Sequence, residues 1–390
     1  MKKHILLLIV LTLTLTIWWN VGLAIDNQPD YWPTKDWSSV SPESQGMDSN
    51  LLAKMLDRIW ENDIEIHGIV IVRNGYKVLD AYSYPLTADD IHPIYSITKS
   101  VTSALVGIAI DKGYINNVNQ TVLNLFPKRV AKNLDSNKKA IKIQHLLTMS
   151  SGLECRDSYH DYWVGLRQLE NSSDWVQFAI DLPMAEAPGT RFNYCNGGTF
   201  LLSAILQQQT GLNALQFAEK YLFGPLGISD FSWPSNRQGI TIGYGGLHMR
   251  PQDMAKIGYL YLNNGMWDDN QIISSQWIKD STRKHISTTE SFDYGYQWWI
   301  TDSNEYLALG YGGQYILVIP ENNIVAVFTG NLTRKDWNIP TGFLKSNIIS
   351  SVKSDKPLSE DPQAIEALKS KIIRWQNTDP SDRDKPKKKG

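Results

Sequence analysis

YSITKSVTSALVGIAIDKGYI, which spans residues 95–115, places a serine and a lysine three residues apart at the start of a long apolar run. The run Val101–Ile110 predicts a buried helix. Ser96 and Lys99 then lie on neighbouring faces of one helical turn, where the lysine amine can accept or relay the proton of the hydroxyl. The helix N-terminus adds a positive field at the same point. The stretch therefore predicts a nucleophilic serine with a lysine partner.

The spacing of this pair is not specific by itself. Three more Ser–Lys pairs share it, at residues 136 and 139, 281 and 284, and 350 and 353. Only Ser96 stands between a turn, His92-Pro93, and an apolar helix whose tip would open on a cleft. The alternative is a serine that caps the helix and a lysine that reaches the surface. A lysine with the ordinary pKa of about 10.4 is protonated at neutral pH, so catalysis requires burial and a neighbouring cation to lower the pKa of Lys99.

A tyrosine about a hundred residues downstream is the second candidate. Tyr194 lies in PGTRFNYCNGG, residues 188–198. Its phenol has an ordinary pKa of about 10, and a lysine ammonium beside it would lower that pKa, so that Tyr194 and Lys99 shuttle one proton. Asn196 offers a donor and an acceptor for orienting a substrate amide or Lys99. The Tyr-x-Asn spacing recurs twice elsewhere, so this motif is also weak by itself.

A glycine-rich segment is the third candidate. It comprises Tyr311, Gly312, Gly313 and Gln314, directly before the strand-like run 315–319. Glycine there would let a substrate approach the strand edge closely. The backbone N–H of Gln314 would then join that of the nucleophile as an oxyanion hole. The alternative is an ordinary glycine-rich turn.

Strand-like runs stand near both ends of the chain, and helical spacing fills the middle. Asn74-Gly75 between two such runs is the strongest short-range hairpin signal. The predicted strands are 68–72, 77–83, 315–319 and 324–329. The predicted helices are 51–59, 101–112, 143–149, 175–181, 198–209, 214–223, 251–263 and 275–282. This pattern predicts an α+β fold, in which N- and C-terminal strands form one antiparallel sheet flanked by helices.

The predicted domain spans residues 46–353. A mostly helical region, about 101–291, is inserted into an α/β region made of 46–100 and 292–353. An extended lead-in covers 25–45. Residues 354–390 form a polar tail with a possible helix from Pro362 to Trp375, after which the chain should be disordered.

The first 24 residues are typical of a secretory signal. Lys2 and Lys3 precede the apolar run Ile5–Trp19, and Gly22-Leu23-Ala24 resembles a cleavage site. The chain is therefore expected to be secreted or periplasmic, without stable membrane insertion once the signal is removed. The alternative is an uncleaved N-terminal helix that anchors it to the membrane.

Composition narrows the classes of partner. The 38 basic and 40 acidic residues leave a net charge of −2. This balance lacks the excess of positive charge typical of nucleic-acid-binding proteins and favours a small, uncharged substrate. Cys155 and Cys195 are a candidate disulfide, with two half-buried thiols as the alternative. No metal is expected because neither cysteine belongs to a Cys/His cluster, and the acidic and histidine side chains within 157–161 are typical of a polar loop. No cofactor motif is present.

Taken in order, SITK, YCN and the glycine-rich strand lead-in resemble the serine β-lactamase and penicillin-recognising superfamily. The class C-like branch of secreted serine hydrolases, which includes esterases, D-aminopeptidase-like enzymes and nylon-oligomer hydrolases, is the most similar part. The stretches that carry this resemblance between Trp37 and Leu332 include PESQGMDS, IQHLLTMSSGLE, LFGPLGI, PQDMAKIGYLYLNNG, YGYQWW and GYGGQYILVIP. Their agreement in sequence order is specific, whereas each motif alone is not.

The resemblance implies a role for each candidate. Ser96 would be the nucleophile, Lys99 and Tyr194 the proton-handling pair, and Asn196 a polar orienting group. The amides of Ser96 and Gln314 would form the oxyanion hole. It also implies an antiparallel sheet flanked by helices, with the active site at the junction with the helical region.

One departure bears on the substrate. The third motif of β-lactamases and transpeptidases usually begins with a lysine that binds a carboxylate, and Tyr311 stands there instead. The expected reaction is therefore hydrolysis of an uncharged ester or amide through a Ser96 acyl-enzyme, with Tyr95, Tyr311, Trp298 and Trp299 as candidate walls of an apolar pocket. The alternatives are a β-lactamase or penicillin-binding D,D-carboxypeptidase, and a catalytically silent binding or sensor protein of the same fold.

Overall fold

A computed structural model describes residue 29, residues 31–158 and residues 162–379. Residues from Tyr31 onward form one compact unit. The predicted signal at 1–24, most of the 157–161 loop and the last residues of the tail lie outside the described residues. Within the described ranges, no helix is both long enough and apolar enough to cross a bilayer.

The predicted N-terminal hairpin is present. Strands β1 (Ile66–Arg73) and β2 (Tyr76–Tyr82) pair antiparallel across Asn74-Gly75. Both turn residues have positive φ, 51° and 85°, which is the conformation that an Asn-Gly hairpin turn requires.

Strands from both ends of the chain form one seven-stranded sheet. Its order is β2-β1-β12-β11-β10-β9-β8, and neighbouring strands pair antiparallel. The remaining strands of this sheet are β8 (Asp293–Tyr294), β9 (Trp299–Ile300), β10 (Tyr306–Gly310), β11 (Gln314–Ile319) and β12 (Ile324–Gly330). The β1 strand lies against β12, with Val70 opposite Val327. This pairing confirms the prediction of a sheet built from both termini.

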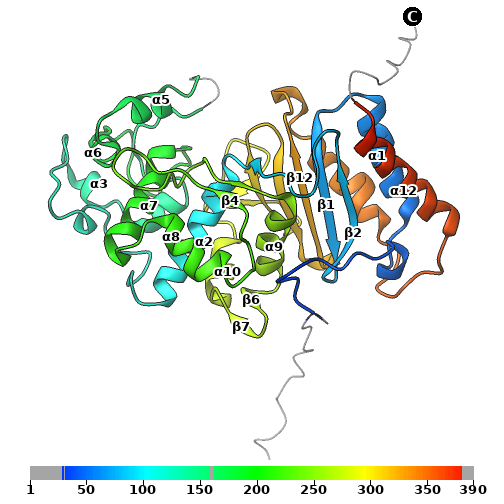
Figure 1. Cartoon of the computed structure of the whole chain (residues 1–390). Helices are drawn as coiled ribbons and strands as arrows, with labels where there is room; N and C mark the ends of the chain where they lie inside the picture. Colours follow the sequence, from blue (N-terminus) through cyan, green and yellow to red (C-terminus); the bar gives the residue numbers. More distant parts are fainter. Residues whose placement is uncertain (1–28, 30, 159–161, 380–390) are drawn as a thin grey trace, which may run out of the picture. The chain divides into compact units, whose positions relative to one another are not determined.

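Helices cover both faces of the sheet. Alternate residues of a strand point to opposite faces, so neighbouring residues of β1 belong to different cores. Val70 and Val72 belong to one core with α2 (Ile97–Asp111), α7 (Asn196–Thr210) and α9 (Pro251–Leu262). Ile69 and Ile71 belong to a second core with α1 (Ser49–Glu61) and α12 (Pro362–Asn377). Figure 1 shows α1 (Ser49–Glu61) and α12 (Pro362–Asn377) beside β1 and β2, on the side away from the helical region.

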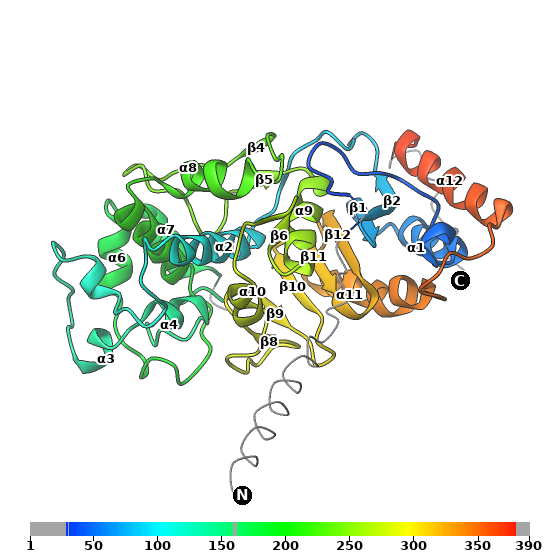
Figure 2. The same ribbon diagram turned by 90° about the horizontal axis from the view of Figure 1, so that it is seen from below.

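The helical region surrounds α2 (Ile97–Asp111). This helix contacts α7 and α8 and also reaches β10 and β11, so it joins the helical region to the sheet (Figure 2). The other helices in this part of the chain are α3 (Ser136–Lys139), α4 (Ile143–Leu147), α5 (Val164–Asn171), α6 (Trp175–Asp181), α7 (Asn196–Thr210), α8 (Ala214–Ala218), α9 (Pro251–Leu262) and α10 (Ser275–Ser281).

Three helices differ from the sequence expectation. The helix predicted from Val101 begins at Ile97, because the polar side chains of its first turn are themselves buried. The helix predicted over 214–223 is α8 followed by a π-helical turn, Glu219–Phe223. The helix of the polar tail packs against α1 and buries Leu368 and Trp375, so it belongs to the second core.

Candidate active site

Ser96 is half-buried at the N-terminal tip of α2, after a strained residue. Tyr95 has a φ of 46°, which is uncommon for a residue that is not glycine and costs about 1 to 3 kcal/mol. The segment before it is fixed, since the Ile94 N–H donates to the Leu247 carbonyl over 3.0 Å and His92-Pro93 pairs with β5 (His248–Met249). The surrounding structure thus maintains the strained turn that presents the Ser96 hydroxyl.

Lys99 lies directly behind this hydroxyl. Its Nζ is 3.0 Å from Ser96 Oγ and donates to the Tyr244 carbonyl over 2.7 Å. The Lys99 side chain is only 1% exposed, and the Ser96 side chain caps none of the helix N–H groups. The alternative of a capping serine with a lysine at the surface is therefore wrong.

Burial lowers the pKa of Lys99 to about 7, while the Asp157 carboxylate opposes this change. No neighbouring cation contributes among the causes of the shift, so the cation that the sequence argument required is not needed. At neutral pH a large fraction of Lys99 is uncharged. An uncharged amine next to a serine hydroxyl can accept its proton.

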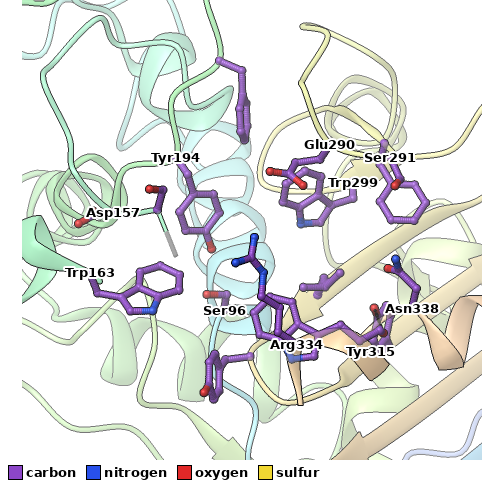
Figure 3. A pocket seen from close by; sticks show the side chains of 16 residues that line it. Ser96, Asp157, Trp163, Tyr194, Glu290, Ser291, Trp299, Tyr315, Arg334 and Asn338 are labelled. Carbon is purple, nitrogen blue, oxygen red and sulfur yellow. Dashed lines mark hydrogen bonds between the residues drawn. The ribbon is translucent and has the colours of Figure 1, made fainter. Parts of the chain in front are cut away.

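Tyr194 completes the arrangement predicted from the sequence. Lys99 Nζ lies 4.8 Å from the centre of the Tyr194 ring, and the phenol hydroxyl points toward Ser96 in Figure 3. Burial raises the pKa of Tyr194 above its ordinary value, and a hydrogen bond with Ser96 opposes that rise only in part. The predicted lowering of this pKa is wrong, because loss of hydration, together with the nearby Asp157 charge, outweighs the hydrogen bond with Ser96. Tyr194 is a neutral phenol that can donate or relay a proton.

A cross-linked pair of segments holds Tyr194 in place. Cys155 and Cys195 form a disulfide, which answers the question that the sequence left open. Asn193 Nδ2 donates to the Leu153 carbonyl over 3.1 Å, so the residue before Tyr194 is tied to the same loop. Residues 153–157 thus bind the residues directly before and after Tyr194 and hold the tyrosine in position.

Asn196 lies beside Asp157, and its role as an orienting group stays a prediction. It is the first residue of α7 and is 3% exposed, and its backbone N–H donates to Asp157 Oδ2 over 2.7 Å. It is absent from the described lining of the cavity beside Ser96. Through its contact with Asp157, the backbone of Asn196 helps to hold the site in place.

The glycines of the third motif also have a structural reason. Gly312 and Gly313 have φ values of 76° and 87°, and a Cβ on Gly313 would lie 2.5 Å from a Leu332 methyl group. Leu332 is bound in turn through its N–H to the Gly312 carbonyl, over 2.8 Å. Gln314 is fully buried, and its Nε2 donates to the carbonyls of Tyr311 and Gly330, so only its main chain is available to face the site.

A cavity of about 330 Å³ opens in front of Ser96, and Figure 3 shows the side chains around it. Its size is at the lower end of the range for small-molecule sites. It is lined by Ser96, Asp157, Ser158, Trp163, Phe192, Tyr194, Glu290, Ser291, Phe292, Trp299, Leu309, Tyr311, Tyr315, Arg334, Trp337 and Asn338. The lining includes Tyr194 and Tyr311 but neither Gly312, Gly313 nor Gln314.

The predicted aromatic walls divide into two groups. Trp299 and Tyr311 line the cavity, and Tyr95 stacks edge-on against Tyr311 with ring centres 5.6 Å apart. Trp298, in contrast, is fully buried in the core. Adjacent residues of an extended segment face opposite ways, which explains why one tryptophan reaches the cavity and the other does not.

Sequence reasoning missed three residues of the site. Asp157 was treated as part of a polar loop, Tyr244 was not considered, and Arg334 lies in a polar stretch without periodicity. The only local signal was the group of two acidic residues and a histidine at 157–161, which is typical of a polar loop. Within the residues that the structure describes, no group of three or more His, Cys, Asp or Glu side chains is arranged to hold a metal ion.

Known proteins share the fold and parts of the sequence. A family profile described as Beta-lactamase matches residues 52–340. The 6-aminohexanoate-dimer hydrolase of Paenarthrobacter ureafaciens is 24% identical over 282 residues, which cover 66% of this chain and 70% of that protein. A Bacillus anthracis protein provisionally named a 6-aminohexanoate-dimer hydrolase has a TM-score of 0.66 at 20% identity, covering 83% of this chain and 88% of the other. A family VIII carboxylesterase has a TM-score of 0.62 at 14% identity, covering 87% and 99%. These two structural likenesses show a common fold.

Proposed function

Because the chain belongs to the beta-lactamase family, we propose that it is a serine hydrolase that cleaves an ester or amide through an acyl-enzyme on Ser96. The observation that carries this proposal is the 3.0 Å contact between Ser96 Oγ and a buried amine whose pKa is about 7. A serine hydroxyl is a weak nucleophile until a neighbouring base accepts its proton. The uncharged form of Lys99 is that base.

The first half-reaction forms the acyl-enzyme. Ser96 Oγ attacks the carbonyl carbon of the substrate while its proton passes to Lys99 Nζ. The tetrahedral intermediate then expels an alcohol or amine, which takes a proton from the Tyr194 phenol, and Lys99 returns a proton to Tyr194. The amides of Ser96 and Gln314 are proposed to bind the oxyanion.

The second half-reaction releases the product. Water attacks the acyl carbon, and its proton passes through the same Tyr194 and Lys99 pair to Ser96 Oγ as the ester bond breaks. The products are a carboxylic acid and the regenerated serine. No step requires a metal ion or an organic cofactor.

The substrate and the location of the enzyme have separate support. The P. ureafaciens relative is named for an amide substrate, which supports an amide as well as an ester here. The Cys155–Cys195 disulfide supports a secreted or periplasmic location, because such bonds persist in oxidising compartments. Export would require the signal-like first 24 residues.

A serine-directed fluorophosphonate reagent tests the nucleophile. Labelled protein is digested and the modified peptide is mapped by mass spectrometry. We expect the label on Ser96, and none on the Ser96→Ala variant. Ser103→Ala is the control, since Ser103 lies two turns along the same helix and its buried hydroxyl has no hydrogen-bond partner among the described residues.

Either of two results would refute the assignment: a label on another residue, or unchanged labelling of Ser96→Ala. A panel of short-chain nitrophenyl esters, D-amino acid amides and nitrocefin then separates the reactions. Rapid turnover of nitrocefin would favour a β-lactamase. No turnover of any compound by a protein that also resists the fluorophosphonate would favour a silent binding protein.

A further inference from the structure

Tyr114 and Tyr221 meet on the surface, at the end of α2 away from Ser96. Tyr114 follows the last turn of α2, and Tyr221 belongs to the π-helical turn after α8. Their hydroxyl oxygens are 3.4 Å apart, although 107 residues separate them in the chain. Both rings pack against Phe217, whose ring centre is 6.0 Å from that of Tyr114 and 4.7 Å from that of Tyr221. Because Phe217 is fully buried, it holds the two phenols beside each other.

Two lysine ammonium groups flank the Tyr221 ring. Lys112 Nζ lies 4.5 Å from the centre of this ring, and Lys220 Nζ lies 4.9 Å from it. The hydrogen bond with Tyr114 and the positive charges of the two lysines hold the pKa of Tyr221 below its ordinary value. A phenolate loses an electron more readily than a neutral phenol does. Tyr221 is therefore expected to be oxidised before other exposed tyrosines.

Two other tyrosine pairs are close enough to compete. Tyr31 and Tyr76 stack with ring centres 5.2 Å apart, but the Tyr31 hydroxyl donates to the Gly75 carbonyl and burial raises the pKa of Tyr31. Tyr95 and Tyr311 meet edge-on with ring centres 5.6 Å apart. Both of these rings are exposed, so this pair is the competitor that peptide mapping must distinguish.

We propose that a peroxidase acting with hydrogen peroxide, a one-electron oxidant, joins Tyr114 to Tyr221 as an intramolecular dityrosine. Each phenol gives up one electron and one proton and becomes a phenoxyl radical. The two radicals combine through a carbon ortho to each oxygen, and the two ortho hydrogens move to the oxygens as the rings regain aromaticity. The protein loses two hydrogen atoms in total, and one molecule of peroxide becomes two molecules of water.

The cross-link would staple the end of α2 to the segment after α8. It closes a loop with a sequence separation of 107, and a covalent link across a long loop stabilises a protein mainly by restricting its unfolded chain. Unlike the Cys155–Cys195 disulfide, it is not broken by thiol reductants. The inference does not depend on the proposed hydrolase function, since neither tyrosine belongs to the described lining of the cavity beside Ser96.

The test treats the dilute native protein with horseradish peroxidase and limiting hydrogen peroxide. The monomer band is isolated on a denaturing gel, its dityrosine fluorescence is measured, and its cross-linked peptides are mapped by mass spectrometry. The variants Tyr114→Phe and Tyr221→Phe each remove one exposed hydroxyl. Tyr84→Phe is the matched control, because Tyr84 is 41% exposed, close to the 39% of Tyr114, and belongs to none of the three pairs.

We expect one peptide that contains Tyr114 joined to one that contains Tyr221, with a mass two hydrogens below their sum. The monomer fluorescence should be lost in Tyr114→Phe and in Tyr221→Phe and retained in Tyr84→Phe. Fluorescence that persists in both of the first two variants would overturn the inference. A cross-link mapped to Tyr95 and Tyr311 in place of the proposed pair, or a product confined to dimers, would overturn it as well.

Urea unfolding tests the staple. After oxidation, the native protein should unfold at a higher urea concentration than oxidised Tyr114→Phe, because only the native protein carries the link. The midpoints of the two proteins before oxidation provide the baseline for this comparison. If oxidation shifts both midpoints equally although Tyr114 and Tyr221 are joined in the native protein, the stabilising role is refuted.

Discussion

The Asp157 carboxylate accepts a hydrogen bond from the Asn196 backbone N–H over 2.7 Å, and this bond joins the loop before α5 to the first residue of α7. Burial raises the pKa of Asp157 above its ordinary value, and the Asn196 N–H and the Lys99 amine oppose that rise only in part. The Asp157 carboxylate also raises the pKa of Lys99 relative to what burial alone would give.

The pH dependence of hydrolysis should reflect Lys99. Its folded pKa of about 7 lies below its ordinary value of 10.5, so the amine is protonated and inactive as a base in acid. We expect kcat/KM for a neutral ester to rise tenfold per pH unit below about pH 7 and to level above it. Initial rates between pH 5 and 9 measure this profile. A profile that is flat or falls across that range would contradict the role of Lys99 as base.

Asp157→Asn should move the same profile. Removing the carboxylate removes an interaction that favours the charged amine, so the pKa of Lys99 falls and the acid limb shifts to lower pH. The expected shift is about one pH unit, and the asparagine keeps a side chain of similar shape. A limb that stays in place, or moves to higher pH, would show that Asp157 does not act on Lys99. Circular dichroism of the variant verifies that it is folded.

Lys99→Met should lower the activity and raise the stability of the protein. Loss of the base should lower kcat about 10²- to 10⁴-fold. The folded pKa of Lys99 is lowered, so the unfolded chain binds more protons between about pH 7 and 10.5 and stability rises with pH across that window. The buried amine therefore destabilises the fold to its full extent below about pH 7 and no longer does so above about pH 10.5. Urea unfolding should show a gain of roughly 2 to 4 kcal/mol for the variant at pH 6 and little gain near pH 10.5.

The disulfide should support both the fold and the site. It closes a loop with a sequence separation of 40, for which chain entropy gives about 4 kcal/mol. Cys155→Ser should lower the free energy of unfolding by about that amount, and it should lower kcat because Tyr194 adjoins Cys195. Reductant should destabilise the native protein in a urea titration and leave Cys155→Ser unaffected. Equal effects of reductant on both proteins would contradict this role.

Gly313→Ala and Gly113→Ala form a matched pair. Both glycines have positive φ, 87° and 74°, so each variant incurs a backbone cost of about 1 kcal/mol. A Cβ at Gly113 meets nothing within 4 Å, whereas one at Gly313 lies 2.5 Å from Leu332. Gly313→Ala should therefore be less stable by a further 1 to 3 kcal/mol. Equal midpoints in thermal unfolding would show that Leu332 moves aside freely.

The sheet shows which parts of the fold the sequence could indicate. Asn74-Gly75 and the alternating runs around it signalled the hairpin, because a turn and its two strands are local in the chain. The proximity of β1 and β12 was inferred from the position of strands at both ends, and the structure confirms it. Ser96 and Lys99 were expected at the start of this helix, but its buried run was counted only from Val101, since a buried Lys99 and its polar neighbours do not look like core residues until their partners are known.

The amino-acid sequence determined the placement of Ser96 one helical turn from Lys99, because residues three apart on a helix are neighbours whatever surrounds them. Tertiary structure decided what that pair can do. The pKa of Lys99 depends on burial and on Asp157, the position of Tyr194 depends on a loop 40 residues upstream, and Arg334 reaches the cavity from the segment that follows β12. These properties arise from contacts between residues distant in the chain, and no local pattern encodes them.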